Sequence, residues 1–151
     1  MEYTFRINHS GRNILLQFLE NHTLEQLNKI PEGFNNNLIW NIGHIVVVQQ
    51  MLVYRLSGLP MMITDEMVAK YMKGTKPESD ATEQDVEQIK SLLFTTLEQA
   101  KKDFQGDIFK TYNEFTTSAG YTVKNAQDAM EFNNYHEGLH TGIMMQIRKF
   151  L

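Results

Sequence analysis

His136-Glu137-Gly138-Leu139-His140 carries more structural information than any other stretch of this 151-residue chain. Its two histidines are four residues apart, so on an α-helix both rings lie on one face, with Cβ atoms about 6 Å apart. Two neutral imidazoles on one helical face form half of a site for a first-row metal such as zinc, nickel, copper or iron. Because the chain has five histidines, an accidental pair at this spacing is the competing interpretation.

The residues around the pair predict the helix that carries it. Apolar side chains recur every three or four positions and form one stripe that includes a histidine. The members are Ala129, Phe132, His136, Leu139, Ile143, Ile147 and Phe150. We expect this stripe to face a hydrophobic interior, with His140 beside it. Histidines in such an interior need polar partners, because an unpaired buried polar group costs on the order of 1–3 kcal/mol. One metal ion satisfies both rings.

Helical periodicity extends through most of the remaining sequence. Three further long helices are expected over residues 6–21, 38–56 and 82–104, with short helices near 23–29 and 65–71. The apolar face of the first is marked by Ile7, Ile14, Leu15, Phe18 and Leu19. Thr122 is expected to cap the last helix, after a connection over 107–121 that is partly extended.

Four long amphipathic helices in one short chain predict an all-α fold, a four-helix bundle with long inter-helix connections. The length of those connections argues against the simplest up-down-up-down arrangement. The chain length indicates a single domain over residues 1–151. Bundle cores are places where side chains from facing helices build metal sites.

Composition excludes several classes of function. The chain has no cysteine, so it has no disulfides, thiolate ligands or cysteine nucleophile. The net charge is −4 and no basic face is evident, so nucleic acid is not an expected partner. No apolar run approaches the length of a membrane span, and the N-terminus shows no signal-peptide core. We expect a cytoplasmic, soluble protein with no membrane partner.

The histidine stretch also matches H-E-x-x-H, the pattern of zinc peptidases in which the glutamate is the general base. Those enzymes take their third ligand from downstream, but residues 141–151 contain no Asp, Glu or His. They also hold the peptide against a sheet edge, and this chain shows no convincing sheet. The peptidase interpretation is therefore rejected.

A catalytic metal site usually has three protein ligands, so the third must lie upstream. His44 is the best choice, because it lies in Trp40-Asn41-Ile42-Gly43-His44-Ile45 on the helix expected to be most buried. Gly43 would allow another helix or a ligand to approach closely. The alternative is a core histidine satisfied by a neighbour. His9 and His22 lie among polar residues near helix ends and are expected at the surface.

A family resemblance rests on these same segments. Leu24-Glu25-Gln26-Leu27, Ile30-Pro31-Glu32-Gly33-Phe34 and the segment around His44 resemble the first half of a DinB-like protein. Thr122 opening a last helix, with His136-x-x-x-His140-x-Gly142 near its end, resembles the second half. The family includes bacillithiol and mycothiol S-transferases and related metal-dependent enzymes. The resemblance implies a bundle that holds a divalent metal through His44, His136 and His140, commonly in a homodimer.

Three nearby polar residues are candidates for binding substrate or orienting a ligand. Asn133 lies one turn before His136, and Asn41 lies three residues before His44. Metal-bound histidines usually donate their other N–H to such a partner, although an amide can equally satisfy a polar group inside a helix. Glu137 points about 100° away from His136 around the helix. Its interpretations are a base, a hydrogen-bond acceptor behind the ligands, or a solvent-exposed charge, and we favour the last two.

Three histidines leave metal positions open, and a thiol bound to such an ion loses its proton at neutral pH. This suggests an enzyme that transfers a low-molecular-weight thiol to an electrophile, with zinc or nickel as cofactor. The same site could instead lower the pKa of a bound water to about 7 for hydrolysis. A third alternative is a non-enzymatic stress-response or binding module. Three histidines do not distinguish zinc from nickel.

Overall fold

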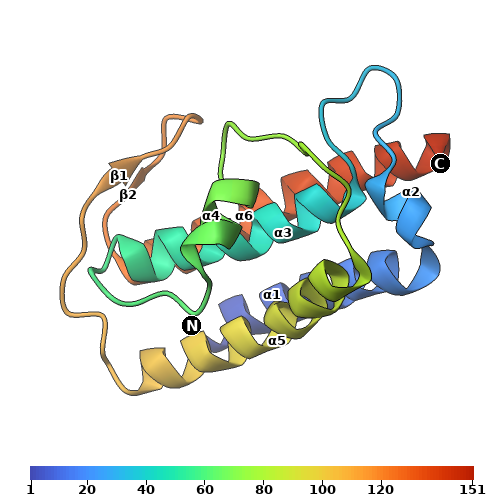
Figure 1. Cartoon of the computed structure of the whole chain (residues 1–151). Coiled ribbons are helices and arrows are strands. Elements are labelled where there is room, and N and C mark those ends of the chain that lie inside the picture. The colour runs from blue at the N-terminus through green and yellow to red at the C-terminus, as the bar shows by residue number, and fades with distance from the viewer.

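Four long helices form the body of the molecule, which a computed structural model describes for residues 1–151 (Figure 1). These are α1 (Glu2–Asn21), α3 (Leu38–Gln50), α5 (Glu83–Gln105) and α6 (Ala126–Ile147). α1 packs on α5 and α6, and α3 packs on the same two helices from the other side. The all-α fold expected from the periodicity is confirmed.

Shorter elements fill the connections between the long helices. α2 (Leu24–Asn28) follows α1, and α4 (Asp65–Tyr71) lies in the crossover from α3 to α5. A π-helical turn, η1 (Met51–Arg55), ends α3, and a 3₁₀ turn, η2 (Arg148–Phe150), ends α6. β1 (Phe115–Thr116) and β2 (Thr122–Val123) form a two-stranded antiparallel hairpin before α6. No helix is both long enough and apolar enough to span a membrane.

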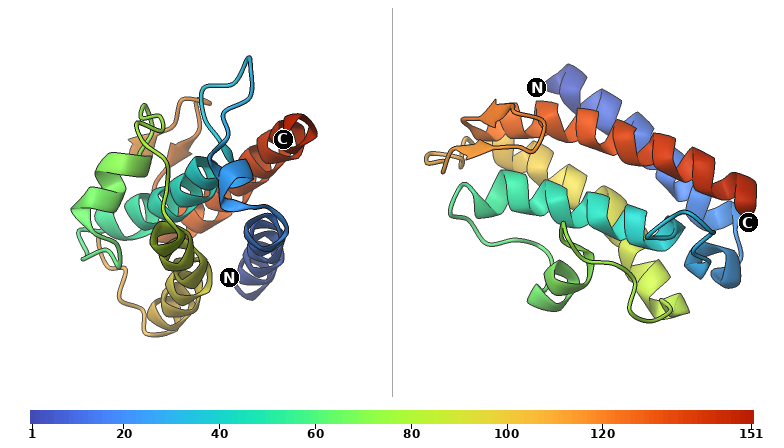
Figure 2. Two further views of the ribbon diagram at one scale, coloured as in Figure 1. Left: turned by 45° about the vertical axis from the view of Figure 1, so that its right-hand side comes forward. Right: turned by 90° about the horizontal axis from the view of Figure 1, so that it is seen from above.

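The long crossover determines the helix directions. α1 and α6 run the same way, whereas α3 and α5 both run the opposite way (Figures 1 and 2). The side chains agree, because Asn8 bonds to Asn134 near the start of the α1–α6 contact and the Phe18 ring lies under Arg148 near its end. The topology is therefore up-down-down-up, which agrees with the expectation that it is not the simplest up-down-up-down arrangement. α3 and α6 are antiparallel neighbours, which brings residues distant in sequence onto facing helices.

α6 does not bury the stripe predicted for it. Ala129 and Ile147 are buried, but Leu139, Ile143 and Phe150 are 50%, 39% and 57% exposed. The buried face carries the polar residues Asn133 and Glu137 beside Met130 and Met144. The stripe prediction was therefore wrong for the three exposed positions.

A buried ion pair explains why this face of α6, rather than the predicted apolar stripe, turns inward. The Arg12 side chain on α1 is fully buried, and its Nη2 donates to Glu137 Oε1 at 2.8 Å while Nη1 donates to the Leu93 carbonyl at 3.0 Å. A buried charge is tolerated only when it is paired and hydrogen-bonded, so this pair fixes which faces of α1 and α6 turn inward. α1 also departs from its predicted apolar face, because Ile7 and Ile14 are 47% and 36% exposed.

The start of α6 also differs from expectation. Asn125, not Thr122, caps the helix, and its Oδ1 accepts a hydrogen bond from the Asp128 amide at 2.8 Å. Thr122 lies in β2, where its hydroxyl bonds to that of Thr116 at 3.0 Å. Both residue types favour the N-cap position, so pairing in the hairpin decides between them.

Candidate metal centre

The structure brings three histidines together between α3 and α6. His44 comes from the middle of α3, and His136 and His140 come from successive turns of α6. Their ring centroids are 4.6 to 5.2 Å apart, and one nitrogen from each ring lies within 4.8 Å of the others. Nitrogens this close can bind a single ion, so the three positions predicted from sequence form one cluster.

The His44 ring is fixed by its own hydrogen bond and by stacking. Its Nδ1 donates to the Tyr71 carbonyl at 2.7 Å, and Trp40 stacks on the ring with centroids 4.8 Å apart and an interplanar angle of 12°. Gly43 makes this possible, because a Cβ there would lie 2.7 Å from the Tyr71 ring. The carbonyl bond places the proton on Nδ1 and leaves the Nε2 lone pair for a ligand.

The His140 ring is oriented in the same manner. Its Nδ1 donates to Asn41 Oδ1 at 2.8 Å. The Asn41 amide is held in turn, because its Nδ2 donates to the Asn37 carbonyl at 2.7 Å and to Asn36 Oδ1 at 2.9 Å. This is the partner arrangement that metal-bound histidines usually have.

His136 has no such partner. Its Nδ1 is buried and makes no hydrogen bond to the protein. A buried polar nitrogen without a partner is costly, which makes this ring the least satisfied of the three. The other two rings crowd it, and burial together with those rings lowers the pKa of His136 to about 3.

The electrostatics of the cluster favour neutral rings. Burial and the nearby His44 lower the pKa of His140 to about 4. Burial is also the largest cause of a lowered pKa at His44, where the Tyr71 bond opposes the shift and the charge of Lys73 adds to it. At neutral pH all three rings are therefore unprotonated, which is the form that binds a metal. Three neutral imidazoles with two fixed orientations fit a divalent first-row ion.

The side chains of Asn133 and Glu137 make no hydrogen bond to the triad. Glu137 is 4% exposed, which excludes the solvent-exposed interpretation. Its carboxylate accepts hydrogen bonds from Arg12 and from Asn133 Nδ2, the latter at 2.7 Å. Both residues lie on α6 with the histidines, and through Arg12 they link this helix to α1.

The comparison with protein families agrees with this geometry. The family model described as the DinB superfamily matches residues 8–144, which is most of the chain and includes all three histidines. This chain belongs to the DinB superfamily. No curated protein matches it.

Two residues near the centre of this DinB-superfamily protein were missed from sequence. Tyr71 was expected only as the end of a short helix, yet its carbonyl orients His44. Lys73, exposed in the following loop, is near enough for its charge to act on His44. A backbone acceptor leaves no signal in side-chain identity, so only Gly43, which predicts a close approach, pointed toward this contact.

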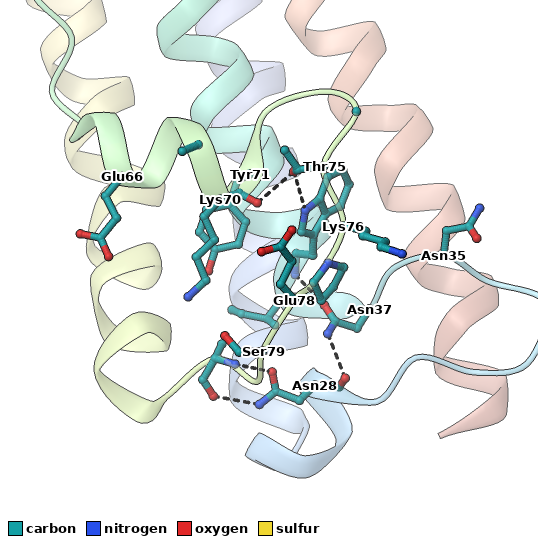
Figure 3. A pocket seen from close by; sticks show the side chains of 16 residues that line it. Asn28, Asn35, Asn37, Glu66, Lys70, Tyr71, Thr75, Lys76, Glu78 and Ser79 are labelled. Carbon is teal, nitrogen blue, oxygen red and sulfur yellow. Dashed lines mark hydrogen bonds between the residues drawn. The ribbon is translucent and has the colours of Figure 1, made fainter.

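A cavity of about 790 Å³ lies beside the centre and does not include it. Trp40 and Tyr71 line it, together with Lys70, Thr75, Lys76 and Glu78 (Figure 3). None of the three histidines is part of the lining. The cavity therefore borders Trp40 and Tyr71, the two residues that contact His44, but it does not include the triad.

Proposed function

We propose that this DinB-superfamily protein is a divalent-metal-dependent enzyme that transfers a small thiol to an electrophilic substrate. The ligands would be His44, His136 and His140, and the ion would be zinc or nickel. The observation that carries the proposal is the convergence of three neutral imidazoles, two of them oriented through Nδ1.

The ion, when bound, would supply Lewis acidity that lowers the pKa of a thiol or water ligand. The chain supplies orientation and electrostatics. Tyr71 and Asn41 fix two rings, and burial keeps all three unprotonated at neutral pH. Arg12 and Glu137 hold α6 in the rotation that presents its histidines to α3.

The side chains around the triad supply no general base. A hydrolase commonly uses a carboxylate or histidine as general base beside the attacking water. No carboxylate bonds to the triad, and Glu137, next to His136 in sequence, is paired with Arg12. Because the ion would lower the pKa of a bound water as well as that of a bound thiol, the preference for thiol transfer rests on the resemblance to the S-transferases of the family. We also propose a homodimer in the cytoplasm, on the resemblance and composition already described, with sedimentation as the test of assembly.

Metal content and parallel assays test this function. The purified protein should retain close to one equivalent of a divalent metal, and His44→Ala should lose it. The loaded protein is then assayed for conjugation of several small thiols to an electrophile and for ester and amide hydrolysis. His9→Ala is the matched control, because His9 is exposed on α1 and outside the triad. Conjugation that requires His44 but not His9 supports the proposal.

The other outcomes select the alternatives. Hydrolysis that depends on His44, without conjugation, identifies the site as that of a hydrolase. Metal binding with neither reaction identifies a binding or stress-response module. Absence of metal from both the purified and the reloaded protein rejects the metal centre itself.

A further inference from the structure

An aromatic surface extends from the triad toward solvent. The Phe132 ring lies one turn before His136, with centroids 6.4 Å apart and an interplanar angle of 27°. The Tyr121 ring, from the turn of the β1–β2 hairpin, lies parallel to Phe132 at 5.9 Å and 7°. A row of three neighbouring rings, of which Tyr121 and Phe132 are nearly parallel, therefore connects the hairpin to His136 of the triad.

The spacing of these rings leaves part of each face uncovered by its neighbour. Rings in full face-to-face contact have centroids much closer than 5.9 Å, so these pairs are offset. Tyr121 is 47% exposed and Phe132 is half-buried. Contiguous exposed apolar surface on a soluble protein marks a candidate binding site, whereas singly scattered apolar residues do not.

The position of the surface indicates what binds there. It begins at His136, continues with Phe132 and ends with Tyr121, so it is continuous with the triad. Apart from the Tyr121 hydroxyl, the two rings offer only apolar atoms to a ligand. A flat apolar group matches this surface, because aromatic rings pack on one another in offset parallel arrangements.

We propose that Tyr121 and Phe132 form the subsite for an aromatic group on the small molecule that reacts at the triad. The inference rests on the proposed function and deepens it, since it defines the substrate class as small arene-bearing thiols or electrophiles. The subsite selects the substrate by shape and polarity and takes no part in bond making.

Two hydroxamic acids test the subsite without requiring turnover. Benzohydroxamate and acetohydroxamate share one metal-binding group and differ in a phenyl ring against a methyl group. Each is titrated into protein loaded with Co²⁺, and the visible spectrum of the ion reports binding. We expect benzohydroxamate to bind about threefold to tenfold more tightly than acetohydroxamate, the range typical of one aromatic contact.

Variants assign this preference to the two rings. Tyr121→Ala should remove most of it and leave acetohydroxamate binding and Co²⁺ content unchanged. Phe132→Leu, which keeps apolar bulk in a half-buried position, should reduce it in the same direction. Tyr3→Ala is the control, because Tyr3 is a 71% exposed tyrosine on α1. It should leave both affinities unchanged.

The remaining outcomes overturn the inference in distinguishable ways. Equal affinity of the two hydroxamates, with clear binding of both, rejects the aromatic subsite and leaves the metal-dependent function standing. If neither hydroxamate changes the visible spectrum of the Co²⁺ ion, the ion has no open position. That result rejects both the function and the subsite. A change of Tyr121→Ala from dimer to monomer in sedimentation, with the hydroxamate preference intact, identifies the surface as a subunit contact instead.

Discussion

The indole of Trp40 lies almost parallel to the His44 imidazole, at a centroid distance of 4.8 Å and an angle of 12°. Trp40 is the only tryptophan in the chain. The stacking therefore places the single strong fluorophore directly against one ring of the proposed metal centre. Any change in the charge or coordination of that ring acts on the indole.

Metal binding should be visible in this fluorescence. We expect Ni²⁺ or Co²⁺ to quench Trp40 emission and to saturate near one equivalent, because both ions quench excited indoles at short range. His44→Ala should lose this saturable phase, whereas His22→Ala should keep it, since His22 stacks on Phe18 at the far end of α1. Quenching that is equal in wild type and His44→Ala would place the ion elsewhere.

Asn41 should set metal affinity without being a ligand. Its Oδ1 accepts the His140 Nδ1 proton at 2.8 Å, and loss of such partners typically costs 10–100-fold in metal affinity. We expect Asn41→Ala to weaken Zn²⁺ binding within that range in a competition titration with a chelating dye. Asn41→Leu keeps the bulk of the side chain but offers no acceptor, so it should lose affinity to a similar extent. Wild-type affinity in Asn41→Leu would show that the amide acts on packing alone.

Substitutions of Arg12 and Glu137 should have non-additive effects on stability. Arg12→Met leaves a buried carboxylate without its cation, and Glu137→Met leaves a buried guanidinium. Removing one partner of such a pair costs about 3–5 kcal/mol of unfolding free energy, whereas replacing both by apolar residues can be neutral. Urea unfolding should show both single variants strongly destabilised and the double variant much closer to wild type. An additive double variant would argue against direct coupling.

The stability of the metal-free protein should depend on pH through the triad. Burial lowers the pKa of His136 to about 3 and of His140 to about 4, whereas unfolded histidines titrate near 6.5. Between these values the unfolded chain binds more protons than the folded chain, so unfolding free energy falls as pH falls. The contribution is therefore complete above about pH 6.5 and is lost progressively toward pH 4 and below.

Urea titrations between pH 7.5 and 4 measure this dependence. Carboxylates also lose charge in the lower part of the range, so the relevant quantity is the difference between wild type and the double variant His136→Gln, His140→Gln. We expect the variant to have the shallower slope between pH 6.5 and 4. Parallel curves would mean that the two rings are solvated enough to protonate normally in the folded protein.

Local spacing predicted much of this molecule. The i, i+4 separation of His136 and His140 required them to share a helical face, and Gly43 beside His44 indicated the close contact that Tyr71 makes. The positions of the long helices followed from apolar periodicity. These features depend on residues that are near one another in sequence.

Features that depend on distant partners could not be predicted in the same way. The apolar stripe of α6 was expected to face inward, but Arg12, 125 residues away from Glu137, pairs with that carboxylate and turns a partly polar face into the core. Arg12 lies at helical spacing within the buried series Phe5, Asn8, Leu15 and Leu19 on α1. That spacing was the available signal of a buried cation. Its partner could not be identified from one sequence.

Crystallographic anomalous diffraction at the zinc absorption edge, on crystals grown with Zn²⁺, tests the central claim most directly. We predict one strong peak for each chain, between α3 and α6 and about 2.0–2.1 Å from a nitrogen of His44, His136 and His140. Absence of that peak from crystals that contain zinc elsewhere, or a peak that excludes His44, would contradict the three-histidine centre and the function built on it.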